Sequence, residues 1–290
     1  MLAMGRRLLM FGGSTFVETH WTDTPCTVSR CMDAWRRSRP CAASARTSNA
    51  AAPGIAVLET VTPLAGSNVL VDSNIVHDTN QAPLGDSGCI YNTDNHVNLG
   101  VGITNNIVYN CLGKGIYLDN NTSFVTLVNN IIYGTNQFCW IIHGGDHDLF
   151  KNNICDTTNF AAIGANPTVA FLYQDVSGNS GTNFGMNYNN IMDNIIYSGN
   201  NSQPVPVWQT SSAYVTAPPI VSKNIYYAAS GTAFTNPNML AGSTFTVTDT
   251  APFFGSPQFT NAAAHDYSFT GTYANDNIGF VPINTANIGP

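Results

Sequence analysis

Charged residues are scarce in this 290-residue chain, where Asp, Glu, Lys and Arg together make up 9%. No Arg follows Arg46, and residues 51–290 hold three Lys against fourteen acidic residues, a net charge of −11. A nucleic-acid partner needs basic side chains that neutralise phosphates, so this composition argues against one. No apolar run approaches the roughly 20 residues of a membrane span. An apolar content of 43% excludes a disordered chain.

The first fifty residues differ from the rest, because they hold all seven Arg and three of the seven Cys. A secretory signal is disfavoured there, since the apolar run Leu8–Phe11 stops at Gly12 and no small-residue cleavage site follows. We therefore expect residues 1–50 to be an N-terminal extension or cap of uncertain structure. Residues 51–240 would form the repeats described next, and residues 241–290 would close the last open coil, with His265 and Asp266 as turn residues.

The cysteines include no C-x-x-C pair, which argues against a zinc ribbon and against a dense disulfide framework. Four of them lie inside apolar segments, where we expect them to pack as small hydrophobic side chains. These four are Cys89, Cys111, Cys139 and Cys155.

A unit recurs from residue 70 in which Asn precedes a β-branched residue and often a Tyr. Its copies begin at Asn74, Asn106, Asn130, Asn153, Asn194 and Asn224. The intervals of 32, 24, 23, 41 and 30 residues fit a base period near 23 with insertions. Short strands separated by Asn- and Gly-rich corners bury a hydrophobic face only by stacking coil on coil. Asn suits such corners, because it tolerates left-handed backbone and its amide can pair with the Asn of the next coil. The pattern predicts an all-β fold, a single-stranded right-handed parallel β-helix of about eight coils.

Three successive coils place ionisable residues at the end of the same short strand. Asp94, Asp119 and His143 are separated by 25 and 24 residues, one coil each. Stacked strands lie about 4.8 Å apart, near the carboxylate separation of about 5–5.5 Å that retaining glycosidases use. We therefore expect Asp119 and Asp94 to divide the acid/base and nucleophile roles, assisted by His143. Inward Ile116 and Leu118 would place Tyr117 and Asp119 on the outside of the coil.

Further residues near these positions are candidates for substrate binding. Aromatic side chains at the same strand could stack on sugar rings, and the following corner adds polar groups. These candidates are Tyr91, Tyr117, Trp140, Asn120, Asp146, His147 and Lys151. The run Asp146–Asp148 with His143 could instead bind a metal, but its spacing is not a recognised ligand pattern, so we expect no metal site. Asp and Asn are also ordinary residues at β-helix corners, and each residue has a purely structural alternative.

The runs GDSGCIY (85–91), GIYLDNN (115–121) and HGGDHDLFKNNI (143–154) resemble secreted bacterial β-helical glycosidases that include fucosidase and xylanase activities. The resemblance implies a pectate-lyase-like solenoid and a secreted, cell-surface or periplasmic location. It also implies that Asp119 is the first acid of a Y-L-D-D motif, whose second acid is replaced here by Asn120. Asn92-Thr93-Asp94, Asp119 and His143 follow the order of polygalacturonase motifs more faintly, without that family's Arg-x-Lys clamp.

The sequence thus predicts a glycoside hydrolase that cleaves a neutral or weakly charged polysaccharide or oligosaccharide without a cofactor, although calcium could bridge a charged sugar. A polysaccharide lyase or epimerase acting on a uronate is the first alternative. The lack of cationic side chains argues against it. A carbohydrate-binding or adhesive β-helix without activity is the second alternative, consistent with the loss of the second acid at Asn120.

Overall fold

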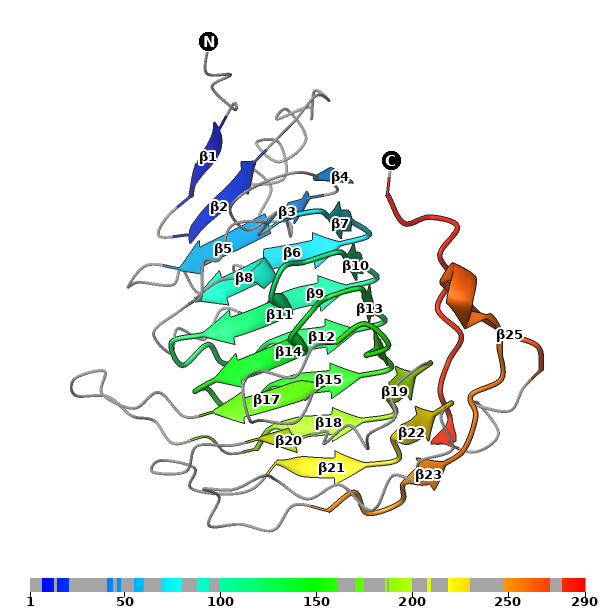
Figure 1. Ribbon diagram of the computed structural model, residues 1–290. Coiled ribbons are helices and arrows are strands. Elements are labelled where there is room, and N and C mark those ends of the chain that lie inside the picture. Colours follow the sequence, from blue (N-terminus) through cyan, green and yellow to red (C-terminus); the bar gives the residue numbers. More distant parts are fainter. Residues whose placement is uncertain are drawn as a thin grey trace.

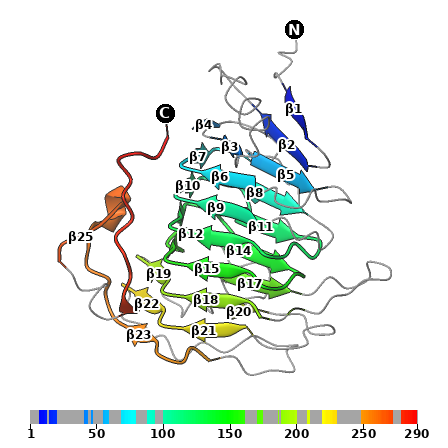
Figure 2. The ribbon, with the colours of Figure 1, turned by 180° about the vertical axis from the view of Figure 1, so that it is seen from behind.

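The computed structural model of the protein describes residues 7–12, 15–20, 41–43, 46–47, 55–59, 69–79, 88–93, 100–160, 170–174, 186, 188–199, 208–209, 219–229, 248–271 and 278–289. Before residue 55, and at 56–59, 69, 172–174 and 208–209, only the backbone is described. The chain winds repeatedly around one axis and forms a parallel β-helix, which Figure 1 and Figure 2 show from opposite sides. Helix is nearly absent among the described residues, and η1 is a single 3-10 turn (Ala262–Ala264). The expected all-β class and parallel β-helix are confirmed.

Three sheets, named A, B and C, form the walls of the coil, and each strand is hydrogen-bonded to strands of neighbouring coils. Sheet A consists of β1 (Arg7–Gly12), β2 (Thr15–His20), β5 (Ile55–Glu59), β8 (Gly88–Thr93), β11 (Lys114–Asp119), β14 (Phe138–His143), β17 (Phe171–Gln174) and β20 (Trp208–Gln209). Sheet B consists of β3 (Cys41–Ala43), β6 (Val69–Asp72), β9 (Val101–Thr104), β12 (Thr126–Val128), β15 (Leu149–Lys151), β18 (Asn190–Met192) and β21 (Ile220–Ser222). Sheet C consists of β4 (Arg46–Thr47), β7 (Ile75–His77), β10 (Ile107–Tyr109), β13 (Ile131–Tyr133), β16 (Ile154–Asp156), β19 (Ile195–Ser198), β22 (Ile225–Ala228) and β23 (Phe253–Phe254).

The number of complete coils is smaller than expected. A complete coil takes one strand from each sheet, beginning with β5–β6–β7 and ending with β20–β21–β22. The strands β3, β4 and β23 belong to incomplete coils, while β2 pairs antiparallel with β5 at the edge of sheet A and β1 pairs antiparallel with β2. The expected count of about eight coils was therefore too high.

The N-terminal residues take part in the β-helix as well as capping it. The hairpin of β1 and β2 pairs antiparallel with β5 through β2 and covers the first edge of sheet A. The strands β3 and β4 pair in parallel with β6 and β7, so coil geometry begins by Cys41. The expected boundary at residue 51 therefore lies after the first parallel pairing.

A ladder of buried asparagine side chains explains the repeat. At each rung, Oδ1 of one Asn accepts from the backbone N–H and Nδ2 of the Asn one coil earlier. The ladder runs Asn74, Asn106, Asn130, Asn153, Asn194 and Asn224. It ends at Asp249, whose Oδ2 accepts from the amide of Asn224 at 2.7 Å and from the hydroxyl of Tyr226 at 3.0 Å. The expected pairing of Asn amides between coils is confirmed, and its carboxylate end was not foreseen.

The left-handed backbone falls one residue earlier than expected. The residue before each ladder Asn has a positive φ, as at Asn105 (55°) and Asn129 (60°), while the ladder residues do not. In pairs such as Asn129-Asn130, the first residue therefore turns the chain and the second forms the ladder.

The four cysteines with described side chains form two disulfides inside the coil, Cys89–Cys111 and Cys139–Cys155. All four are buried, as expected, but the expectation that they pack as separate hydrophobic side chains was wrong. Each disulfide joins the sheet A and sheet C sides of one coil, because Cys89 is in β8 and Cys111 follows β10, while Cys139 is in β14 and Cys155 in β16.

The C-terminal segment does not simply close the last coil. In the described part of the C-terminal segment, β23 extends sheet C at that end by pairing with β22. The chain then forms a hairpin of β24 (Phe259–Asn261) and β25 (Asp266–Phe269) and runs back along the outside of sheet C toward the first coils (Figure 1). The N–H of Gly289 donates to the carbonyl of Ser73 at 2.8 Å. The described C-terminal residues thus cover a lateral face of the coil, in addition to the strand β23 that extends sheet C.

This lateral cover explains why the repeat has two apolar residues after its Asn. The second points inward, and the first points outward into a cluster with the C-terminal segment. The buried members of this outer cluster are Ile131, Ile154, Ile195, Ile225, Tyr267, Ile278 and Phe280. Burying this row removes an apolar surface that would otherwise face water.

Candidate functional site

The central candidate site is a hydrogen-bonded cluster on the outer side of sheet A. It contains Tyr91 on β8, Tyr117 and Asp119 on β11, and His143 on β14. Alternation along β11 places Ile116 and Leu118 in the core and turns Tyr117 and Asp119 outward. The sequence predicted this alternation, and the structure confirms it.

The carboxylate of Asp119 accepts hydrogen bonds at both oxygens. Its Oδ1 lies 2.7 Å from Nδ1 of His143 and 2.8 Å from the backbone N–H of Asn120. Its Oδ2 accepts from the hydroxyl of Tyr91 at 2.6 Å. Burial alone would raise the pKa of Asp119. The hydrogen bonds from His143, Tyr91 and the backbone of Asn120, together with the charge of His143, outweigh burial and hold this pKa below its ordinary value. Asp119 is therefore an anion at neutral pH.

The imidazole of His143 is oriented by this carboxylate. Because a carboxylate only accepts, Nδ1 of His143 carries the proton and donates to Asp119, which leaves Nε2 with a free lone pair in the neutral ring. The hydroxyl oxygen of Tyr117 also lies 3.0 Å from Nδ1. The side chain of His143 is 24% exposed, against 3% for Asp119. His143 is thus the group that a substrate could reach, and Asp119 holds it in place.

The register of sheet A corrects the expected stacking of carboxylates. Thr93, not Asp94, lies beside Asp119 on the preceding coil, and Tyr91 lies beside Tyr117. Asp94 itself falls outside the described residues. The register therefore does not stack two carboxylates on neighbouring coils. The carboxylate separation of a retaining glycosidase, which the sequence led us to expect, has no support from this register.

Trp140 is not a sugar platform. It pairs with Ile116 in the register of β11 and β14, so it points into the coil, where it is fully buried between Phe150 and Phe171. The sequence could have predicted this orientation. Trp140 and His143 are three residues apart on one strand, and an odd separation places two side chains on opposite faces of a sheet.

The remaining candidates divide between this site and other places. Asn120 has a left-handed backbone and donates from Nδ2 to the hydroxyl of Thr93 at 3.0 Å, next to the cluster. Lys151 lies at the far end of β15, where its Nζ is 3.6 Å from Asp193, so the structure does not bring it to His143. A further residue, Lys114, which was not among the candidates from the sequence, lies beside the cluster: its Nζ is 4.3 Å from the ring centroid of Tyr117.

The corner between β14 and β15 holds the other two candidates. Oδ2 of Asp146 lies 3.2 Å from Nδ1 of His147, whose side chain is 43% exposed. Asp148 is fully buried, and its Oδ1 accepts from the backbone N–H of Val125. Among the residues that the structure describes, no three His, Cys, Asp or Glu side chains are grouped to hold a metal ion.

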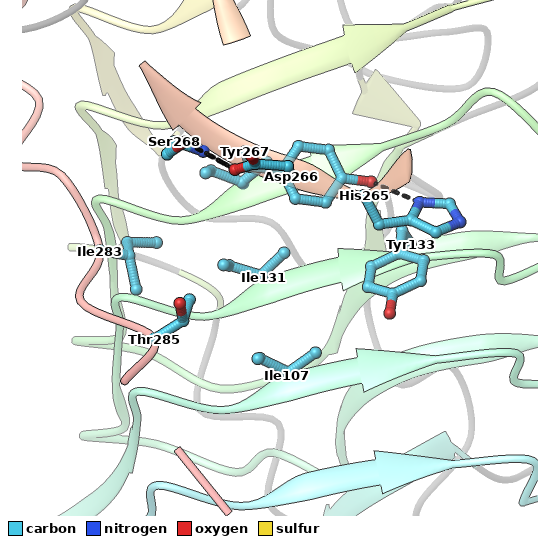
Figure 3. Close-up of a pocket in the computed structure, with 10 residues that line it drawn as sticks. Ile107, Ile131, Tyr133, His265, Asp266, Tyr267, Ser268, Ile283 and Thr285 are labelled. Carbon is cyan, nitrogen blue, oxygen red and sulfur yellow. Dashed lines mark hydrogen bonds between the residues drawn. The ribbon is translucent and has the colours of Figure 1, made fainter. Parts of the chain in front are cut away.

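A small cavity lies elsewhere, between the outer side of sheet C and the C-terminal segment (Figure 3). Ile107 and Ile131 line its floor, and Tyr133 and His265 line one wall with their rings stacked at 4.1 Å. His265 has the left-handed backbone of the expected turn residue. The volume is about 160 Å³, below the roughly 300–1,000 Å³ typical of ligand pockets. We therefore regard this cavity as a gap in the packing of the C-terminal segment.

The comparisons with known proteins add no relative to this geometry. No family model matches the chain, and neither a curated protein nor a solved structure matches it significantly. The resemblance to β-helical glycosidases is therefore carried by the quoted sequence runs alone. No helix in the described part of the chain is long and apolar enough to cross a membrane.

Proposed function

We propose that the chain is a glycoside hydrolase that cleaves a neutral or weakly charged polysaccharide, with His143 as its acid/base group. The observation that carries this proposal is the pairing of a partly exposed His143 with the buried, ionised Asp119. A carboxylate on Nδ1 fixes the tautomer and stabilises the imidazolium that forms when Nε2 takes up a proton. A β-helix alone assigns no activity, so the proposal depends on this site.

In this mechanism, Nε2 of His143 removes a proton from the water that attacks the anomeric carbon. Asp119 is a positioning residue, because both its oxygens are occupied and its side chain is 3% exposed. This reassigns the nucleophile or acid role expected for Asp119 from the sequence. Asp94, one residue beyond Thr93, remains the proposed acid that protonates the leaving group. Residues 51–290, which hold no Arg and carry a net charge of −11, favour an uncharged substrate over a polyanion.

Two features support a secreted, cell-surface or periplasmic location. Two disulfides lie within the coil, and stable disulfides are typical of proteins in oxidising compartments. A polysaccharide is also too large to enter a cell intact, so an enzyme that cleaves it acts outside the cytoplasm.

The test is release of reducing ends from a panel of neutral polysaccharides. Asp119→Asn should lower turnover by about 10²-fold or more and alter the pH dependence of kcat/KM, because the amide can hold the wrong tautomer of His143. Circular dichroism should show an intact fold. Undiminished turnover, or an unchanged pH profile, would contradict the assigned role of Asp119.

One observation favours a second candidate, a polysaccharide lyase or epimerase. Lys114 lies over the ring of Tyr117, whose hydroxyl contacts His143. A cation, a base and a phenol are the groups that abstraction of a proton next to a uronate carboxylate requires. Ultraviolet absorbance from an unsaturated product, without hydrolytic release of sugar, would identify a lyase. Glycan binding without any turnover would instead indicate a carbohydrate-binding or adhesive β-helix.

A further inference from the structure

Three aromatic rings form a column on the outside of the coil, at the corners between sheets A and B. The rings of Phe124 and His147 are 4.7 Å apart and 4° from parallel, and those of His147 and Tyr188 are 4.8 Å apart at 36°. They come from three successive coils, and Tyr188, at one end of the column, is 61% exposed. A Tyr at this position offers an apolar ring face together with a polar hydroxyl, the combination that aromatic side chains supply at interfaces.

This aromatic column (Phe124, His147 and Tyr188) is held close to His143. His147 follows His143 by four residues, a length of chain that spans at most about 14 Å. The backbone N–H of Phe124 donates to the carbonyl of Asp146 at 3.0 Å, and the N–H of Asp146 donates to the hydroxyl of Ser123 at 3.1 Å. These contacts tie the corner that carries Phe124 to the corner that carries His147, which follows the strand of His143.

Close backbone packing fixes the same corner. Gly145 has a φ of +92°, and a Cβ at this position would lie 1.8 Å from the carbonyl oxygen of Thr122. The backbone of Asn121 donates to the carbonyl of His143 at 3.1 Å. The corner that carries His147 is thus built against the corner that follows Asp119, which sets the direction from His143 to the column.

We propose that Tyr188, supported by His147, is a sugar-stacking subsite that binds a part of the polysaccharide away from the bond to be cleaved. The apolar C–H face of a pyranose ring matches an exposed phenol ring, and the carboxylate of Asp146 at 3.2 Å orients His147. The column contains no Lys or Arg, so its chemistry fits an uncharged sugar better than a uronate. This inference rests on the proposed function, because it names a second contact for the same substrate. Binding energy from such a remote unit positions the reacting unit at His143.

The experiment compares Tyr188→Ala, Tyr188→Phe and a matched control, Tyr227→Ala, which removes a stacked tyrosine from sheet C on another wall of the coil. Affinity for xylan, galactan, arabinan and glucomannan is measured by affinity electrophoresis and calorimetry, with the fold checked by circular dichroism. Each variant is also made in a His143→Gln background, so that binding is read without turnover. Tyr188→Ala should weaken binding of the recognised polymer by about tenfold, the loss of one aromatic stacking interaction. Tyr188→Phe and Tyr227→Ala should bind like the parent.

The outcomes separate this inference from the proposed hydrolase. If the wild type cleaves a polymer and Tyr188→Ala binds it unchanged, the subsite is refuted and the hydrolase stands. If the wild type binds a polymer without cleaving it and Tyr188→Ala loses that binding, the subsite stands and the hydrolase is refuted. A chain that neither binds nor cleaves any of these polymers would overturn both.

Discussion

The asparagine ladder makes a quantitative prediction for Asn130→Ala. Asn130 is fully buried, and its Oδ1 accepts from the backbone N–H of Asn106 at 3.0 Å and from its Nδ2 at 2.9 Å. Its own Nδ2 donates to Oδ1 of Asn153 at 3.0 Å and to the carbonyl of Ile103 at 2.9 Å. Alanine would leave the N–H of Asn106 and the carbonyl of Ile103 without these side-chain partners in a closely packed interior.

The magnitude follows from those two groups. Each buried polar group left unsatisfied costs about 1–3 kcal/mol, so Asn130→Ala should lower the free energy of unfolding by about 2–6 kcal/mol. That is a large part of the roughly 5–15 kcal/mol by which a typical domain is stable. Urea denaturation followed by circular dichroism measures it directly.

A matched control is available at the preceding residue. Asn129 belongs to an outer, half-buried ladder, and its φ of +60° suits glycine. Asn129→Gly should cost about 1 kcal/mol, because water can replace the hydrogen bonds that it loses. If Asn130→Ala is no more destabilising than Asn129→Gly, the ladder does not stabilise the coil and the reasoning is refuted.

Three further predictions concern the C-terminal segment, a tyrosine and a disulfide. Tyr267 donates to Oδ2 of buried Asp156 at 2.8 Å, so Tyr267→Phe should cost about 1.5–3 kcal/mol in urea denaturation, and an unchanged midpoint would contradict this anchor. Burial, followed by the charges of neighbouring groups, raises the pKa of Tyr133 to about 12, so stability linked to it should be full below pH 10 and lost as the pH rises toward 12. The difference titration of wild type and Tyr133→Phe should show this shift, and a step near pH 10 would argue against it. Reduction of Cys139–Cys155, which are 16 residues apart, should lower the unfolding free energy by about 3 kcal/mol. Alkylation of these two residues in denatured but unreduced protein would show that the bond is absent.

The repeat made the architecture readable from sequence, because Asn followed by apolar residues at one-coil intervals has one consistent explanation. The alternation of Ile116 and Tyr117, and the pairing of Asp119 with His143 24 residues later, also followed from strand geometry. These inferences succeeded because they depend on local periodicity, which a single sequence contains.

The errors arose where one residue of register or a distant segment decided the outcome. Counting from Tyr91 and Tyr117 gives three residues to Asp94 but two to Asp119, so a strict alternation would have placed Thr93 beside Asp119. The lateral docking of the C-terminal segment could not be predicted in this way. It depends on contacts such as Tyr267 with Asp156, 111 residues apart, that no repeat encodes.

The pairing of cysteines was missed for a related reason. Their spacing shows no disulfide motif, and only the return of the coil brings Cys89 near Cys111. The aromatic column was missed because Phe124 and Tyr188 lie in corners with no shared sequence signature, and the coil carrying Tyr188 includes a long insertion before it.

Turnover by His143→Gln tests the central claim most directly. Glutamine approximates the size of imidazole but cannot take up a proton, so on the polysaccharide that the wild type cleaves it should lower kcat by about 10²–10⁴-fold while the affinity for that polymer stays near the parent value. Cleavage at the wild-type rate by a folded His143→Gln protein would show that the exposed imidazole beside Asp119 is not the acid/base group of this chain.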